Sequence, residues 1–167
     1  GLGDVYKRQV RAMTDRAAEL TDVTLYSGFA VGRADAPYCS PEYKDTFLVN
    51  SLFVANNIRR WLAQGYGQST PAFLGEIPGL FRDGTLPVDV AILNLSRPNE
   101  EGYCSFGVSA DLAVSAVECA RTVIAQVNTA MPFSYGDAVI HLSRVAAAVE
   151  VDDPLVEVPS ATPTDIE

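Results

Sequence analysis

VDVAILNL, residues Val88–Leu95, is the stretch that decides the fold. It is apolar nearly throughout, as expected of a parallel strand that is covered on both faces. An amphipathic helix is predicted downstream at Asp111–Arg121, and a second apolar strand follows at Val123–Val127. Since a strand, a helix and a strand in this order form a parallel pair, we expect the two strands to be neighbours.

The same alternation continues on both sides of this unit. Further elements are predicted from the spacing of apolar residues and from Gly and Pro: helices at Val10–Leu20 and Ala55–Gly65, a helical turn at Glu76–Phe81, strands at Val23–Phe29, Thr46–Phe53, Thr70–Leu74, Gly136–Leu142 and Ala146–Val151, and loops at Gly32–Asp45 and Arg97–Gly107. Asn56 or Asn57 is expected to cap the second helix. The fold class is therefore α/β, a Rossmann-like and mostly parallel sheet with helices on both faces.

Charge and composition exclude several classes of partner and site. Twelve Lys and Arg stand against 21 Asp and Glu, which gives a net charge of −9. This balance disfavours nucleic acid and anionic lipid, and no apolar run reaches the roughly 20 residues of a membrane span. A single histidine, His141, excludes a histidine-rich metal site, so no metal is expected. Cys39, Cys104 and Cys119 lack a paired spacing and are interpreted as free thiols in a reducing compartment.

The two ends differ from the rest of the chain. Gly1–Gln9, GLGDVYKRQ, reads as a non-native adaptor and is set apart from the fold. Residues 159–167 have lost all periodicity and contain Pro159 and Pro163, so they are predicted to form a tail or the start of a linker. One domain is therefore expected over residues 10–158.

Ligands of open α/β sheets bind beyond the carboxyl ends of the strands, which directs attention to the loops after Leu95, Phe53 and Val127. The first of these, Asn94–Ser109, leads into the start of a helix, where an anion is favoured. Spacing alone does not separate a binding loop from an ordinary strand-to-helix connection. The candidate substrate-binding residues are Asn94, Ser96, Pro98, Asn99, Gly102, Tyr103, Cys104 and Ser105, together with Asn56 and Asn57.

Several reactive side chains have a structural interpretation beside the catalytic one. Glu76 is a tempting carboxylate, but an acid there also suits the start of the short helix. Cys104 has no base that the sequence places beside it, which favours a half-buried thiol. His141 is more typical of a hydrogen-bonded histidine at a strand edge. Glu100 and Glu101 are adjacent in a loop and are expected to be solvated.

Several segments in order resemble the acetyl-CoA hydrolase/transferase family, which includes 4-hydroxybutyrate CoA-transferase. They are SLFVANNIR, FLGEIPGLF, VDVAILNLSRPNEEGYCSFGVSADLAVSA, VIAQVNTAMP and GDAVIHLSRVAAAVEVDDPL. The resemblance covers roughly Thr46–Leu155. Asn50 stands where the family usually has His, and Ala55 where it usually has Gly, so the turn between them departs from the pattern.

The resemblance implies an N-terminal domain of an enzyme that moves CoA between an acyl-CoA and a carboxylic acid through a glutamyl-CoA intermediate. The nucleophilic glutamate would lie in a C-terminal half, so no catalytic residue is expected in this chain, and the chain alone should be inactive. No cofactor is implied, because the CoA thioester is the substrate. The implied partners are acyl-CoA, a small carboxylate, the C-terminal domain and further copies of the parent enzyme, in the cytoplasm or, in a eukaryote, the mitochondrion.

Two alternatives remain open at this point. An acyl-CoA hydrolase would complete the same thioester attack with water, and a non-catalytic ligand-binding module would perform no reaction. The place of Phe106 is open as well. With Tyr103 it either forms an apolar surface for the missing domain or folds into this domain's own core.

Overall fold

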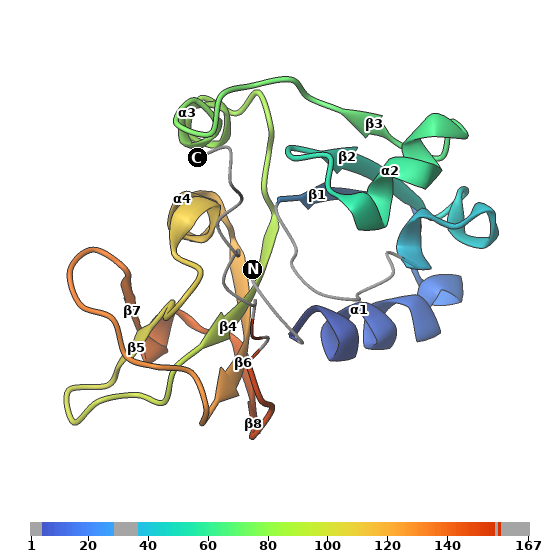
Figure 1. The fold of residues 1–167 in the computed structure, drawn as a ribbon. Helices are drawn as coiled ribbons and strands as arrows, with labels where there is room; N and C mark the ends of the chain where they lie inside the picture. The colour runs from blue at the N-terminus through green and yellow to red at the C-terminus, as the bar shows by residue number, and fades with distance from the viewer. Residues whose placement is uncertain (1–4, 29–36, 156, 158–167) are drawn as a thin grey trace, which may run out of the picture.

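Parallel strand pairs organise the computed structural model, which describes residues 5–28, 37–155 and 157 (Figure 1). Sheet A contains β1 (Val23–Ser27), β2 (Phe47–Ser51) and β3 (Gln68–Ser69) in that order, all parallel. The predicted strand at Thr70–Leu74 is therefore misplaced. The chain pairs with β2 two residues earlier, and residues 70–73 form no regular element.

Sheet B contains the strand that opened the sequence analysis. Its order is β4 (Val90–Leu95), β6 (Thr122–Asn128) and β8 (Ala147–Val151), again all parallel. The register pairs Val90 with Thr122 and Leu95 with Val127, which confirms the predicted parallel neighbours.

A two-stranded antiparallel ribbon interrupts the segment that was expected to be loop. It pairs β5 (Tyr103–Ser105) with β7 (Val139–His141). Three residues are too few for an alternating pattern to stand out, and β5 depends on a partner strand 34 to 38 positions away (Ser105 pairs with Val139 and Tyr103 with His141). The prediction of a loop throughout Arg97–Gly107 was therefore wrong for β5.

In the part of the chain that the structure describes, four α-helices flank the sheets: α1 (Val5–Asp15), α2 (Asn56–Ala63), α3 (Ile77–Arg82) and α4 (Asp111–Cys119). Short 3-10 turns lie at Ala17–Glu19, Pro37–Cys39, Pro41–Tyr43 and Leu142–Arg144. The expected α/β fold of parallel strands flanked by helices is confirmed, although it is divided between two sheets. No helix in the described ranges is long and apolar enough to cross a membrane.

Two expectations about helix starts need correction. Helix α2 begins at Asn56, with Ala55 at the capping position and no side-chain cap, so neither Asn56 nor Asn57 caps it. Both asparagines lie inside the first turn. Helix α1 begins at Val5, within the segment that was set apart as an adaptor, and its Arg8 and Gln9 bond to Asp153 and to the carbonyl of Leu93. The proposed tail, residues 159–167, lies outside the described residues.

Three apolar clusters hold these elements together. Helix α4 and the ribbon cover one face of sheet B around Leu95, Phe106 and Ile140. A second cluster packs α2 on sheet A around Val49 and Ile58. The third joins the two sheet regions through α3, where the Tyr26 and Phe81 rings meet edge to face at 6.1 Å.

Candidate substrate-binding edge

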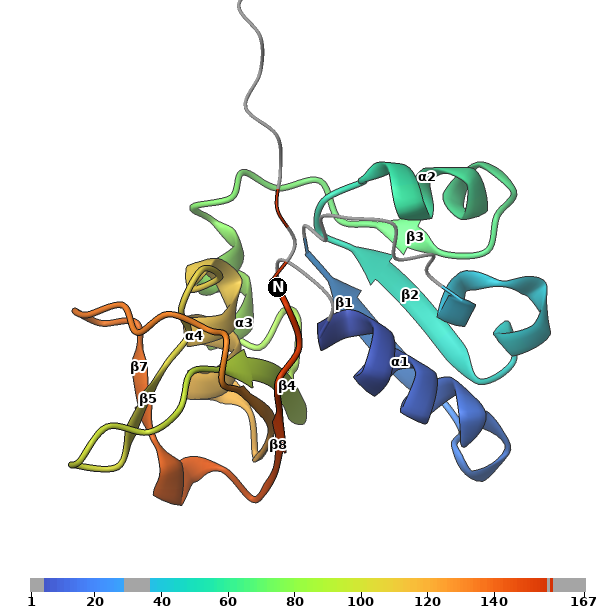
Figure 2. The ribbon, with the colours of Figure 1, turned by 60° about the horizontal axis from the view of Figure 1, so that its bottom comes forward.

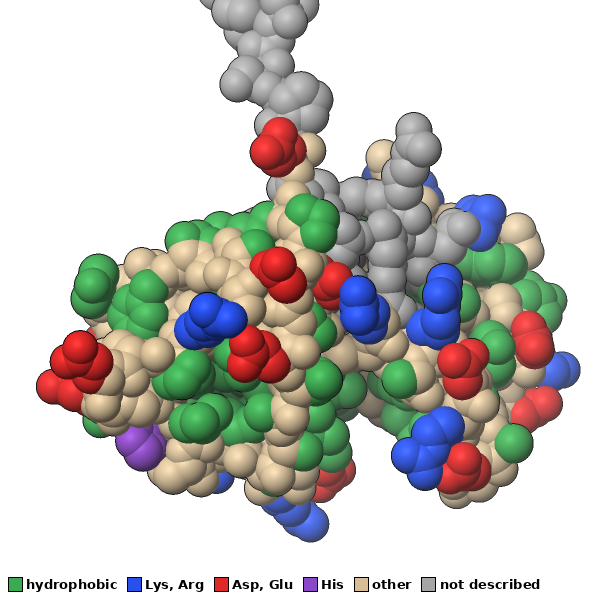
Figure 3. Space-filling view, turned by 90° about the horizontal axis from the view of Figure 1, so that it is seen from below, with side chains coloured by type: hydrophobic (Ala, Val, Ile, Leu, Met, Phe, Trp, Pro, Cys, Tyr) green, Lys and Arg blue, Asp and Glu red, His purple; other side chains and the backbone are tan. Residues whose placement is uncertain are grey.

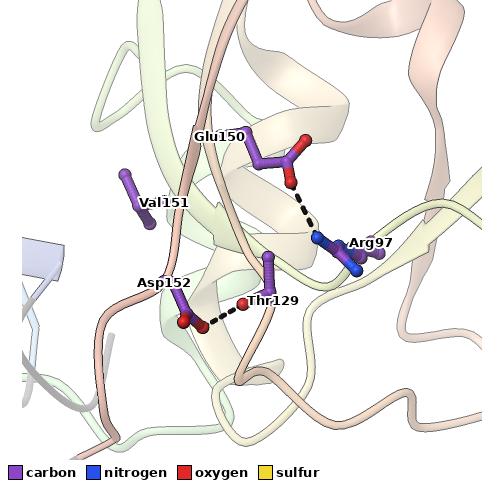
Figure 4. A pocket seen from close by; sticks show the side chains of 5 residues that line it. All are labelled: Arg97, Thr129, Glu150, Val151 and Asp152. Atoms are coloured by element: carbon purple, nitrogen blue, oxygen red, sulfur yellow. Dashed lines mark hydrogen bonds and ion pairs between the residues drawn. The ribbon is translucent and has the colours of Figure 1, made fainter.

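The carboxyl ends of β4, β6 and β8 meet at one edge of sheet B, the position at which ligands bind in open α/β sheets. A pocket of about 380 Å³ lies there, and its wall comes from the segments that leave the three strands (Figure 4). The lining residues are Arg97, Thr129, Glu150, Val151 and Asp152.

The pocket is lined by both positively and negatively charged side chains, and the Arg97–Glu150 pair among them is exposed to solvent. The Arg97 guanidinium donates to a Glu150 carboxylate oxygen at 2.8 Å, and both side chains are largely exposed. An exposed pair of this kind contributes at most about 1 kcal/mol. A planar guanidinium also matches carboxylate and phosphate with two parallel bonds. Arg97 can therefore exchange Glu150 for another anion at little cost in free energy.

The other side of the pocket is held by Thr129. Its hydroxyl donates to the Asp152 carboxylate, and its amide donates to the carbonyl of Val151 at 2.9 Å. These bonds tie the end of β6 to the end of β8, as Figure 4 shows for the hydroxyl. The pocket is thus bounded by the ends of β6 and β8 on two sides and by the loop that carries Arg97 on the third.

Beside the pocket, buried polar groups fix the end of β8. The Asn128 amide nitrogen donates to the Asp153 carbonyl at 2.8 Å, and the Asp153 amide returns a bond to the Asn128 side-chain oxygen at 3.1 Å. Gln126 donates to the Asp153 carboxylate at 3.4 Å, and Arg8 from α1 pairs with the same carboxylate at 2.7 Å. Asn128, Gln126 and Asp153 thus each have a hydrogen-bond partner, which offsets the free-energy cost of burying them.

Of the predicted site residues, Ser96 and Ser105 are buried and hold the β4–β5 loop in shape. The Ser96 hydroxyl accepts from the Ser105 amide at 2.8 Å. The Ser105 hydroxyl accepts from the amides of Gly107 and Ser134, both at 2.9 Å. The Ser96 hydroxyl also donates to the backbone carbonyl of Arg97, a pocket residue, at 2.9 Å. These contacts position neighbouring segments of the loop.

The tip of the same loop is a hydrogen-bonded turn. The Asn99 side-chain oxygen accepts from the amides of Glu101 and Tyr103, at 3.1 and 2.8 Å. Gly102 has a φ of 83°, and a side chain there would meet the His141 ring. Tyr103 packs edge-on against that ring at 5.0 Å, and Pro98 is exposed.

Two further candidates lie in strands near this edge, Asn94 in β4 of sheet B and Cys104 in β5 of the ribbon. The Asn94 amide nitrogen and oxygen are both buried, and neither has a partner among the described residues. Cys104 is completely buried, and burial raises the pKa of its thiol. A completely buried thiol is a poor nucleophile, which favours the structural interpretation of Cys104, although the thiol is fully buried where the sequence suggested half burial.

The remaining candidates are also in structural roles. The Glu76 carboxylate accepts from the Phe73 amide at 2.9 Å and closes the turn before α3, and it makes no side-chain capping bond at the start of that helix. His141 Nδ1 and the Ser143 hydroxyl lie 2.8 Å apart, which confirms a hydrogen-bonded histidine. Glu100 and Glu101 are exposed, and all three cysteines are free, as expected.

Asn56 and Asn57 do not join the other candidates. They lie in the first turn of α2 over sheet A, while the β4–β5 loop extends from sheet B on the other side of the molecule (Figures 1 and 2). The structure therefore brings together the Asn94–Ser105 group and leaves these two asparagines apart.

Sequence reasoning missed all five pocket residues: Arg97, Thr129, Glu150, Val151 and Asp152. The loop after Val127 was recognised as informative, but no residue in it was chosen. The signal for the last three was available, because the strand at Ala146–Val151 was predicted and its carboxyl end had to lie at the same edge as that of β4. In the described part of the chain, no three His, Cys, Asp or Glu side chains gather as metal ligands.

Comparison with known proteins gives a consistent result. The acetyl-CoA hydrolase/transferase N-terminal domain family matches residues 7–159. The 4-hydroxybutyrate coenzyme A transferase of Clostridium kluyveri is 41% identical over 138 residues, 83% of this chain and 32% of that protein. A succinyl-CoA:acetate/propanoyl-CoA:succinate CoA transferase of Fasciola hepatica is 34% identical over 80% of this chain and 28% of its own length.

Solved structures agree with these relatives. The 4-hydroxybutyrate CoA-transferase of Porphyromonas gingivalis superposes with a TM-score of 0.73 at 35% identity, covering 96% of this chain and 37% of that one. RipA from Yersinia pestis gives a TM-score of 0.83 at 26% identity, covering 98% and 41%. The chain thus spans about a third of the length of the curated relatives it matches.

Proposed function

Because the chain belongs to the acetyl-CoA hydrolase/transferase family through that family's N-terminal domain, we propose that it is the first domain of an enzyme that moves CoA between an acyl-CoA and a carboxylic acid. The observation that carries this proposal is the match of over four fifths of the chain to a CoA transferase at 41% identity. The sheet B edge supports it, since an accessible arginine lies where a ligand of an α/β sheet is expected.

The proposed reaction is a covalent exchange in which the nucleophile belongs to the remainder of the parent enzyme. A glutamate carboxylate attacks the thioester carbonyl and expels CoA thiolate, which leaves an acyl-glutamyl anhydride. The thiolate then attacks the glutamyl carbonyl and releases the first acid, so that CoA is held as a glutamyl thioester. The acceptor carboxylate reverses both steps. No redox change and no cofactor is needed.

The part we assign to this domain is recognition of an anion. Both substrates carry negative charge, on the acid carboxylate and on the phosphates of CoA. Among the described residues the Arg97 side chain pairs with the exposed Glu150 alone, so a substrate anion can take the place of Glu150. Asn99 shapes the loop that presents Arg97, and Thr129 fixes the opposite wall.

The test uses Arg97→Gln in the parent enzyme, with Arg121→Gln as the matched control. Arg121 also forms an exposed ion pair, with Asp89 at 3.6 Å, but it lies at the amino end of sheet B. Initial rates are measured with acetyl-CoA and a short carboxylate acceptor, varying each substrate in turn. We expect Arg97→Gln to raise one KM about tenfold, equivalent to about 1.4 kcal/mol, and Arg121→Gln to change neither.

The outcomes separate the alternatives. A raised KM for the acid assigns Arg97 to the acceptor carboxylate, and a raised KM for acetyl-CoA assigns it to a CoA phosphate. CoA release that is equally fast without an acceptor acid would indicate that the parent enzyme is a hydrolase and not a transferase. Equal kinetics for the two variants would remove Arg97 from substrate binding. The 167-residue chain alone is expected to transfer no CoA, and turnover by it would contradict the placement of the nucleophile elsewhere.

A further inference from the structure

One face of sheet B is covered by α4 and the β5–β7 ribbon, and the opposite face, here called the outer face, is apolar and open. It is formed by alternate side chains of the three strands: Val90 and Ile92 of β4, Ile124 of β6, and Ala147 and Val149 of β8. The register places Ile92, Ile124 and Ala147 in one row across the sheet. Val90, Ile92, Ile124 and Val149 are 48, 46, 38 and 56% exposed.

Polar groups limit this face at both ends and are absent from its middle. At the carboxyl end the row is followed by Asn94 and Gln126, and there α1 reaches the sheet through Gln9, which donates to the Leu93 carbonyl at 3.1 Å. At the amino end lies the exposed Arg121–Asp89 pair. The apolar row between them carries no charged side chain.

The shape of the molecule indicates the kind of group that covers this face. Figure 3 shows a hollow between the part built on sheet B and the part built on sheet A, with hydrophobic side chains along its walls. A segment inserted between the two sheets fills a hollow of this shape. Parallel strands are normally covered on both faces, and a contiguous exposed apolar patch of this kind marks an interface.

We propose that in the parent enzyme an apolar segment from outside residues 1–167 packs on the outer face of sheet B and fills this hollow. The inference rests on the proposed function, in which the chain is one part of a larger CoA transferase. The lengths agree with it, because the chain covers 32% of the Clostridium kluyveri relative and 37% of the Porphyromonas gingivalis structure. About two thirds of such a polypeptide is therefore available to supply the segment.

The experiment measures the accessibility of the outer face in the parent enzyme and in the 167-residue chain. Ile124→Cys is labelled with a maleimide, and labelling is quantified at that peptide by mass spectrometry. Val149→Cys provides a second position on the same face. Leu142→Cys is the matched control, since Leu142 is 37% exposed but follows β7 on the other side of the sheet.

We expect Ile124→Cys and Val149→Cys to be labelled at least tenfold more slowly in the parent than in the 167-residue chain, and Leu142→Cys to be labelled equally in both. Equal labelling at Ile124 and Val149 would overturn the inference. Protection in the 167-residue chain that increases with its concentration would overturn it too, by assigning the face to a second copy. Activity is a separate readout: protection in a parent without CoA transfer would sustain the interface and refute the function.

Discussion

At the scale of single residues, Phe106 decides between two interpretations that the sequence left open. Its ring is only 2% exposed and packs with Leu95, Cys104 and Ile140, while neighbouring Tyr103 is 40% exposed. Alternation along β5 sends Tyr103 outward and Cys104 inward, and the turn that follows returns Phe106 to the core. The interpretation of Phe106 as an interface residue is therefore wrong.

Phe106→Ser should consequently destabilise the chain. Removing a buried ring costs about 3–5 kcal/mol, and the serine hydroxyl adds an unpaired polar group. Tyr103→Ser is the control and should cost less than half as much, because its ring is partly solvated. Urea unfolding monitored by circular dichroism measures both. A Phe106→Ser chain that is more soluble and equally stable would restore the interface interpretation.

Cys39 predicts how stability depends on alkaline pH. It is buried in the sheet A cluster, and burial raises the pKa of its thiol from 9.0 to about 12. The unfolded chain therefore ionises first. The stabilisation from keeping this thiol protonated is complete below pH 9 and is lost as the pH rises toward 12.

The corresponding measurement is the free energy of unfolding of the wild type and of Cys39→Ala between pH 8 and about 11. The wild type should lose up to about 1.4 kcal/mol per pH unit more than the variant above pH 9. Val49→Ala serves as the control, because it removes a buried side chain of the same cluster that does not titrate, and its pH profile should follow that of the wild type. Parallel profiles for wild type and Cys39→Ala would show that Cys39 ionises normally in the folded chain.

At the scale of elements, the turn from β5 to α4 depends on a glycine. Gly107 has a φ of +61°, and a Cβ at this position would overlap the Met131 sulfur and closely approach the Pro132 carbonyl. Its amide also donates to the Ser105 hydroxyl. The turn, the ribbon and the segment after β6 therefore meet at one backbone position where no side chain fits.

Gly107→Ala is expected to lower the free energy of unfolding by about 2–4 kcal/mol, from the left-handed backbone and the overlap together. Gly84→Ala is the matched control: its φ is +79°, and nothing lies within 4 Å of the added carbon. It should cost only the backbone part, about 1–2 kcal/mol. Similar losses for both variants in chemical denaturation would mean that Met131 moves aside freely.

At the scale of the whole molecule, sheets A and B each have their own apolar cluster, and a third cluster joins the two sheet regions. The two sheets do not form one continuous sheet. Helix α3 packs between them, and Tyr26 of β1 reaches Phe81 of α3. Figure 2 shows α1 beside sheet A, with its first turns directed toward β8 of sheet B, consistent with the Arg8–Asp153 pair. The hollow between the sheets, with its apolar wall, is the place where the proposed additional segment would complete this arrangement.

The sequence by itself determined the elements whose apolar side chains repeat over five or more residues. Val90–Leu95, Thr122–Asn128 and Asp111–Cys119 all lie where periodicity placed them, because the side-chain period of a strand or helix is a local property of the backbone. The parallel pairing of β4 with β6 followed from the strand–helix–strand order. The segments that resemble the acetyl-CoA hydrolase/transferase family, taken in their order along the chain, likewise indicated the family without any tertiary information.

Only the tertiary structure decided which residues meet. The β5–β7 ribbon, the ion pair of Arg97 with Glu150 and the contact of Arg8 with Asp153 join positions between 34 and 145 residues apart, and no local pattern encodes such distances. Val90 and Ile92 looked as buried as Ala91 and Leu93 in the sequence, yet only the second pair is enclosed. Composition records that a side chain is apolar, whereas burial depends on which element packs over it, and that is a property of the assembled fold.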